Sequence, residues 1–221
     1  MSDAATIPDA DTIPDAARKL EWAPRGAWAE LPADGHLGTP GAAGTTITAR
    51  NGLGIASLIA AEGSDDALVQ ALKTRFGLDL PSTPLAVRSA THALVWAGPG
   101  QWLLVADDRS GFADDLQALS GLAAIAEQSD GRAALTLSGP KIRDALAKGC
   151  MIDLHPSVFP IGAAALTSIA HIGVHLWRVA DGPDGAVFEI MVARSMAGSF
   201  WSWLSASVAE FGCTLAATGR G

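Results

Sequence analysis

His171 and His175 are the closest pair of histidines in the sequence, and imidazoles are common metal ligands. On a helix, this spacing would place both imidazoles on one face, within reach of a single ion. The segment 172–179 (IGVHLWRV) instead alternates between two kinds of residue, which is typical of a strand. On a strand the two histidines are separated by roughly 13 Å, so the pattern favours two polar side chains on one sheet face over a metal site.

The other candidate groups lack the neighbours that their chemistry needs. The run 52–57 (GLGIAS) holds a G-x-G pair, but it precedes a predicted strand, whereas a dinucleotide-binding loop follows one. Cys150 and Cys213 have no adjacent base in sequence, so both are interpreted as buried structural thiols. Arg132 could bind a carboxylate, but an ion pair with a surface acid is the preferred interpretation. We therefore predict no catalytic, cofactor-binding or metal-binding residue in this chain.

Composition and charge exclude several function classes. The 221 residues carry a net charge of −8, which repels nucleic-acid backbones. Two cysteines cannot form a disulfide framework, and the acidic N-terminus lacks an apolar signal segment, so we expect a cytoplasmic protein. Residues 154–177 contain no Asp, Glu, Lys or Arg, but their prolines, glycines, histidines and β-branched alternation favour buried strands over a membrane span.

Residues 1–45 differ from the rest of the chain because they are rich in Pro, Gly, Ala and acids. We expect an irregular arm here, since this composition buries little apolar surface. Trp22 and Trp28 are among its few large apolar residues. Each either packs onto the chain's own domain or anchors the arm in a partner protein, and the sequence leaves both interpretations open.

From residue 46 onward, the same order of elements is predicted twice. In the first half, residues 46–127, we expect strands over 53–61, 93–97 and 102–106, a helix between Ser64 and Gly77, and a second helix near residues 112–119. In the second half, residues 128–221, we expect strands over 133–137, 164–170, 172–179 and 187–192, and helices over about 141–148 and 195–211.

Two similar fragments support an internal duplication. Residues 78–81 (LDLP) and 152–156 (IDLHP) follow the first helix of each half. The predicted fold is α+β, with two pseudo-repeated halves of mostly antiparallel sheet, helices on one side of each sheet, and one shared core. In the last helix, Phe200 and Leu204 belong to the apolar stripe, whereas Trp203 is turned about 100° away and is expected at the rim or against a partner.

Several ordered motifs resemble the gamma subunit of heterotetrameric sarcosine oxidase. They are the runs 128–149 (QSDGRAALTLSGPKIRDALAKG), 150–156 (CMIDLHP), 98–105 (GPGQWLLV) and 199–204 (SFWSWL). The resemblance covers roughly residues 50–212 and does not extend over the arm. It implies a fold similar to the folate-binding domain of aminomethyltransferases of the glycine-cleavage T-protein type.

The resemblance also implies a complex that oxidatively demethylates sarcosine to glycine, forming hydrogen peroxide and 5,10-methylenetetrahydrofolate. In that family FAD, FMN, NAD, tetrahydrofolate and zinc belong to the other subunits, so this chain is expected to hold no cofactor. Its expected partners are the alpha, beta and delta subunits, mainly the large flavin-bearing chains, with no nucleic acid and no membrane.

Two hypotheses from different classes follow. The first is a non-catalytic assembly subunit that contacts its partners through Trp22, Trp28, Trp203, His175 and Trp177. A close variant serves a related N-methyl amino acid demethylase of the dimethylglycine type.

The second hypothesis is a standalone folate-binding, aminomethyl-transfer enzyme, which needs an acid facing the pterin and a general base. Asp153 and Glu189 are its candidate acids. Both also have ordinary interpretations, as a turn residue and a strand-surface charge.

Overall fold

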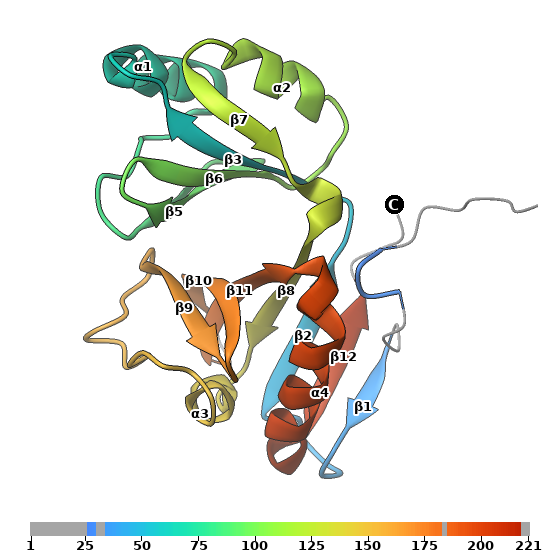
Figure 1. The fold of residues 1–221 in the computed structure, drawn as a ribbon. Helices are drawn as coiled ribbons and strands as arrows, with labels where there is room; N and C mark the ends of the chain where they lie inside the picture. Colours follow the sequence, from blue (N-terminus) through green and yellow to red (C-terminus); the bar gives the residue numbers. More distant parts are fainter. Residues whose placement is uncertain (1–25, 30–33, 183–184, 218–221) are drawn as a thin grey trace, which may run out of the picture.

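The computed structural model describes residues 26–29, 34–182 and 185–217, which fold into two β-sheets covered by helices (Figure 1). One sheet has five strands and the other has seven. The chain passes between the sheets twice: residues 51–53 lead from the larger sheet into the smaller one, and η3 (Ser129–Gly131), a single turn of 3-10 helix, leads back from β7 to β8. The two halves of the chain therefore correspond closely to the two sheets.

The smaller sheet is built from the first half alone. Its elements are β3 (Gly54–Ala60), α1 (Asp65–Phe76), β4 (Ala86–Arg88), β5 (His92–Gly98), β6 (Gln101–Ala106), α2 (Phe112–Ala118) and β7 (Ala123–Glu127). The strand order is β4-β5-β6-β3-β7, with every neighbouring pair antiparallel. The predicted first helix is confirmed: Gly77 ends α1 at a φ of 68°, and Ser64 begins it through its backbone carbonyl rather than its hydroxyl.

The larger sheet repeats this plan and adds two strands. Its elements are β8 (Arg132–Ser138), α3 (Ile142–Ala147), β9 (Ala164–Ile169), β10 (Ile172–Gly182), β11 (Gly185–Ala193), η4 (Arg194–Met196), α4 (Ala197–Val208), η5 (Ala209–Phe211) and β12 (Cys213–Ala217). The order is β1-β12-β2-β8-β11-β10-β9. Read from β9, it matches the smaller sheet, except that β2 (Thr45–Arg50) lies between β8 and β12 and that β1 (Gly35–Leu37) is added beyond β12. The predicted duplicated α+β fold is confirmed.

Helices cover only the outer face of each sheet. Helices α1 and α2 pack on the smaller sheet, with Leu68, Leu72 and Phe112 among the buried residues. Helices α3 and α4 pack on the larger sheet, with Phe200 among the buried residues. A third cluster, which includes Val105 from the smaller sheet, fills the space between the two inner faces. The expected single core is therefore wrong: there are three apolar layers, because each sheet is covered on both faces.

The predicted end of the irregular arm, at residue 45, is wrong, because a strand begins at residue 35. Residues Gly35–Leu37 form β1, which pairs with β12, and Thr45 begins β2. Trp28 is buried at 5% exposure. These residues are ordered because they complete the larger sheet, an interaction with distant parts of the chain that local composition does not reveal. Trp22 lies outside the described residues.

The uncharged run 154–177 forms a loop, β9 and the first part of β10. Its predicted alternation is confirmed: Val174 and Leu176 pack toward the helices, whereas Trp177 packs toward the other sheet. A two-residue turn of Ala170 and His171, both at positive φ, joins β9 to β10. In the described ranges, no helix is long and apolar enough to cross a membrane.

Candidate functional site

Trp28, expected as a possible partner anchor, belongs to the chain's own core. Its ring is 5% exposed, and its Nε1 donates a hydrogen bond of 2.8 Å to the carbonyl oxygen of Ala134 in β8. A ring that is buried in its own domain, with its N–H already hydrogen-bonded, exposes too little surface to anchor a partner. Of the two interpretations left open by the sequence, the structure favours packing on the same domain.

The predictions that His175 and Trp177 contact a partner protein are also wrong. Both lie on the inner face of β10, turned toward the smaller sheet. Trp177 is 3% exposed and His175 is 7% exposed. The predicted alternation of β10 was right, but the face that it assigned to these residues is covered by the second sheet rather than by another protein.

Trp203 occupies the rim position that the helical stripe predicted. It is half-buried on α4, with its ring centroid 5.8 Å from that of Phe200. It packs over Gly149, where an added Cβ would approach a ring carbon to 2.8 Å. Trp203 therefore fixes the end of α3 against α4 while one side of its ring reaches solvent.

A chain of ion pairs crosses between the two sheets. Arg50 of β2 contacts Glu189 of β11 at 2.5 Å and Asp107, just after β6, at 2.7 Å. Arg88 of β4 contacts the other oxygen of Asp107 at 2.5 Å. Two cations and two anions balance, so this group holds the sheets together without surplus charge. The expectation that Glu189 is a strand-surface charge is wrong, since it is a buried counter-ion of Arg50.

The imidazole of His175 has no chemical partner suited to catalysis. Burial, and secondarily the nearby Arg132 guanidinium, lower the pKa of His175 to about 4. Its buried Nδ1 lacks a hydrogen-bond partner in the part of the chain that the structure describes. A general base normally needs a pKa near the working pH and an orienting group, and His175 has neither.

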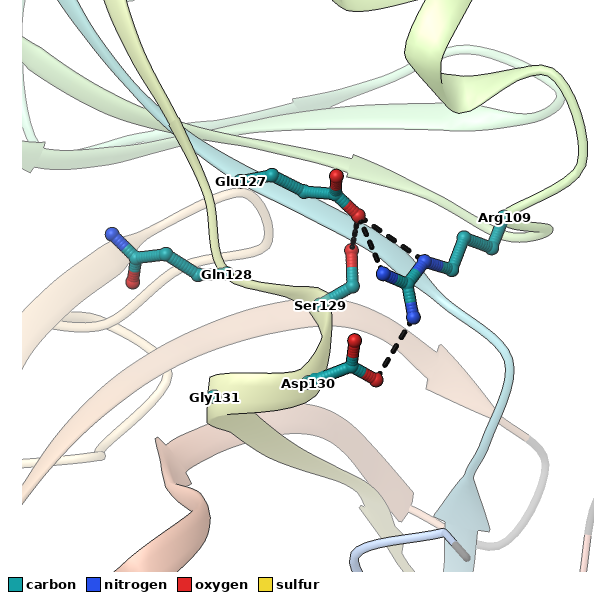
Figure 2. Close-up of a pocket in the computed structure, with 6 residues that line it drawn as sticks. All are labelled: Arg109, Glu127, Gln128, Ser129, Asp130 and Gly131. Atoms are coloured by element: carbon teal, nitrogen blue, oxygen red, sulfur yellow. Dashed lines mark hydrogen bonds and ion pairs between the residues drawn. The ribbon is translucent and has the colours of Figure 1, made fainter. Parts of the chain in front are cut away.

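Figure 2 shows an open pocket of about 320 Å³ where β7 passes through η3 into β8. Arg109 donates to Glu127 at 2.8 Å and to Asp130 at 2.8 Å, and the Ser129 hydroxyl contacts Glu127 at 2.9 Å. The hydrogen bond from Arg109 lowers the pKa of Asp130. Arg109 pairs with both acids of this pocket, which leaves a net charge of −1 on the three exposed groups. The pocket is therefore a surface ion-pair cluster rather than a set of unpaired binding groups.

The remaining candidates have structural explanations. Burial raises the pKa of the Cys150 and Cys213 thiols, which disfavours the nucleophilic thiolate. The Asp153 carboxylate accepts the backbone N–H of His155 at 2.8 Å, so it is the turn residue that the sequence suggested. The surface ion pair expected for Arg132 is wrong: its Nε donates to the side chain of Gln128 at 2.8 Å. Among the described residues, no three His, Cys, Asp or Glu side chains could hold a metal ion together.

The subunit hypothesis predicts exposed apolar patches on the isolated chain, but sequence reasoning did not identify the residues that form them. Five of them, Leu85, Met151, Val158, Ile161 and Leu166, are between 40% and 74% exposed. The signal was present in the uncharged run 154–177, which holds three of the five. The interpretation of that run as buried strands rather than a membrane span does not predict an exposed apolar loop.

The fold defined by these elements is shared with aminomethyltransferases. It superposes on glycine cleavage system aminomethyltransferase T from Bartonella henselae with a TM-score of 0.59, covering 79% of this chain and 48% of that chain. The identity is 14%, so this likeness shows the fold alone.

Residues 60–210 match the model of the sarcosine oxidase, gamma subunit family, and the chain belongs to this family. It is 31% identical over 156 residues to sarcosine oxidase subunit gamma of Corynebacterium sp. (strain U-96), covering 70% of this chain and 74% of that protein. It is 36% identical over 115 residues to the Arthrobacter sp subunit gamma, covering 50% of this chain and 57% of that relative's length.

A solved structure of heterotetrameric sarcosine oxidase from Corynebacterium sp. U-96, in complex with pyrrole 2-carboxylate, is also similar. The match has a TM-score of 0.71 and 28% identity, and it covers 90% of this chain and 99% of that chain. The resemblance read from the sequence motifs is therefore confirmed at the level of family and fold.

Proposed function

We propose that this chain is a non-catalytic gamma subunit of a heterotetrameric sarcosine oxidase, assembled with alpha, beta and delta subunits. The proposed complex demethylates sarcosine to glycine, reduces oxygen to hydrogen peroxide and passes the one-carbon unit to tetrahydrofolate. The match to a chain of the Corynebacterium heterotetramer, 99% of which is covered, carries this proposal.

The internal pairing of the polar side chains supports a non-catalytic role. Arg50 and Arg88 balance Glu189 and Asp107 between the sheets, and Arg109 pairs with both acids of its pocket. Side chains paired in this way leave few free donors and acceptors at these two places for a flavin, a dinucleotide or a pterin, each of which needs such groups in a cavity. We propose that FAD, FMN, NAD, tetrahydrofolate and zinc are held by the other subunits of the complex.

The standalone aminomethyl-transfer enzyme is less well supported. Its two candidate acids are engaged, Asp153 in a turn and Glu189 in an ion pair with Arg50. A gamma subunit of a dimethylglycine-type demethylase would use the same fold, because we propose that the substrate is chosen in another subunit. We place the complex in the cytoplasm.

Purification of the chain from the cells that produce it, through a tag at Gly221, tests the proposal. We expect a large yellow assembly with flavin absorbance, whose other subunits can be identified by peptide mass spectrometry. A colourless particle near 22.6 kDa would contradict the subunit function and would make tetrahydrofolate titration the next measurement.

The segment before the described domain is the place to test an anchoring role for Trp22. We expect deletion of residues 1–25 to weaken assembly while leaving the melting temperature of the isolated chain unchanged. Deletion of residues 1–45 is different, because it also removes Trp28 and β1 from the larger sheet. An unchanged assembly after the shorter deletion would contradict the proposed anchor.

A further inference from the structure

The exposed apolar side chains are concentrated along one edge of the molecule. Seven large apolar residues are exposed among the described ones, and the five named above lie on β9, on the loop before it, or beside its first residue. Leu85 forms a bridge with Ala163, and the backbone N–H of Met151 bonds to the carbonyl of Ser168. We call Leu85, Met151, Val158, Ile161 and Leu166 the β9 edge patch. In Figure 1, β9 and its preceding loop form the left margin of the larger sheet.

The middle of this sheet edge is open. Ile169 and Ile172 flank a two-residue turn and form a backbone hydrogen-bonded pair. Along β9, residues whose backbone N–H and C=O groups bond to β10 therefore alternate with residues whose backbone groups face the open edge. Outward bonds occupy Ala164, which donates to Pro84, and Ser168, which accepts from Met151. Leu166 lies between them with its side chain 55% exposed. The neighbouring segments thus flank Leu166 and bring Leu85 and Met151 to its two sides.

The loop that carries Val158 and Ile161 is fixed from within. Phe159 is 6% exposed and packs on Phe188, with ring centroids 6.3 Å apart. The buried Arg178 guanidinium donates to the Phe159 carbonyl at 2.9 Å and makes a bidentate pair with Asp181. Since Phe159 already anchors the loop, the exposed Val158 and Ile161 add nothing to the core, and their apolar surface is available on a preorganised support.

We propose that the β9 edge patch is the surface through which this chain docks onto an apolar, uncharged face of a larger subunit of the same oxidase complex. The inference rests on the proposed function. The partner face must be uncharged, because the run 154–177 holds no Asp, Glu, Lys or Arg to compensate a buried charge, although the whole chain has a net charge of −8. The chain's own N-terminal segment is a poorer occupant, since β1 lies at the opposite edge of the sheet.

The test replaces Val158 and Ile161 together by aspartate (V158D/I161D) in the full chain, tagged at Gly221 and purified from the producing cells. We expect the flavin absorbance recovered per tagged chain to fall at least about 10-fold, because charges would enter a desolvated apolar contact. Ile59→Asp is the matched control: Ile59 is 45% exposed on β3, outside the patch, and its replacement is expected to leave recovery unchanged.

Circular dichroism and the native mass of the purified particle distinguish the possible outcomes. Far-UV circular dichroism of the isolated variants checks that both fold, and if V158D/I161D does not, Leu166→Lys takes its place. Full flavin recovery with the folded patch variant would overturn the docking surface while leaving the subunit function intact. A wild-type chain that forms only a homodimer lost in V158D/I161D would overturn the heteromeric partner, and a wild-type monomer without flavin would overturn the proposed function itself.

Discussion

The two halves of this chain share an order of elements but differ in the segment that follows their first helix. In the first half, residues 77–85 connect α1 to β4, whereas in the second half the longer segment 148–163 connects α3 to β9. Both contain a similar fragment, 78–81 (LDLP) and 152–156 (IDLHP), whose first and third residues pack on the core of their own half. The first residue, Leu78, is buried in one, and the third, Leu154, in the other. The duplication thus preserves residues that build the core, while the added residues carry Phe159 and the exposed apolar side chains.

The halves also differ in what completes their sheets. The smaller sheet is made by its own half, whereas the larger sheet takes β2 from the first half and β1 from the segment before it. The inner faces meet in one apolar layer. Each half therefore depends on residues of the other, and we expect them to unfold as one cooperative unit.

The largest expected effect comes from matched core truncations, one in each half. Phe112→Ala in α2 and Phe200→Ala in α4 each remove a ring that is at most 1% exposed. Each is expected to cost about 3–5 kcal/mol of unfolding free energy. Differential scanning calorimetry should show one transition shifted as a whole in both variants. Two separated transitions, with only one moved by each truncation, would show that the halves are independent domains.

Loss of Arg50 tests the ion pairs that join the sheets. Arg50→Leu leaves the buried Glu189 without its counter-ion and is expected to cost about 3 kcal/mol. Arg88→Leu is the control, because its side chain is 36% exposed and its loss should cost less than about 1 kcal/mol. Urea unfolding measures both changes. The double variant R50L/E189L should recover much of the loss; equal costs for R50L and R88L would contradict the bridging role.

The equivalent strands β10 and β5, each second from an edge of its sheet, should differ in how their inner faces make stability depend on pH. On β10 the inner face carries His175, whereas the inner face of β5 offers only apolar residues such as Val95 to the shared layer. The folded-state pKa of His175 is about 4, against 6.5 in the unfolded chain, so the unfolded state binds more protons between these values. Stability present above pH 6.5 is therefore lost as the pH falls toward 4, by on the order of 3 kcal/mol.

Melting temperatures measured between pH 7 and pH 4.5 check this expectation. His175→Gln keeps a polar side chain but cannot titrate, so its melting temperature should fall less steeply with acid than that of the wild type. Parallel curves for the two proteins would show that His175 is not protonated on unfolding.

The parts of the fold predicted from the sequence are those encoded by local patterns. Helix α1 is bounded by Ser64 and Gly77, and the strand character of β10 follows from alternation within a few residues. The strand β2 was not predicted between β8 and β12, because this placement depends on pairing with residues far along the chain, such as Thr48 with Thr136.

The predictions of partner-contacting residues were wrong for a related reason. A tryptophan indicates a large apolar contact, but its type does not say whether the contact lies inside the chain or outside it. Trp28 and Trp177 are buried within the chain, where they pack against opposite faces of the larger sheet. Conversely, Val158 is an ordinary core residue by type, and only the anchoring of the loop at Phe159 turns it outward.

The smallest expected effect distinguishes the matched acids of the two repeated fragments. Asp79 forms an exposed ion pair with Lys73 at 2.7 Å, whereas Asp153 accepts a backbone N–H within a turn. Asp79→Ala should therefore cost less than about 0.5 kcal/mol and lose even this in high salt. Asp153→Ala should cost about 1 kcal/mol in both low and high salt, because a turn amide loses its acceptor. Melting curves at two salt concentrations measure the difference.

The same pair of variants also bears on catalysis. If the chain is the proposed non-catalytic subunit, a turn residue in it leaves turnover unchanged once the complex is assembled. Under that proposal, purified complexes carrying Asp153→Ala or Asp79→Ala should oxidise sarcosine at the wild-type rate. A large loss of turnover in the assembled Asp153→Ala complex, with Asp79→Ala unaffected, would instead place an acid of this chain in the reaction. Because the two fragments occupy equivalent positions in the duplicated fold, that result would mean that the halves had diverged in chemistry as well as in loop length.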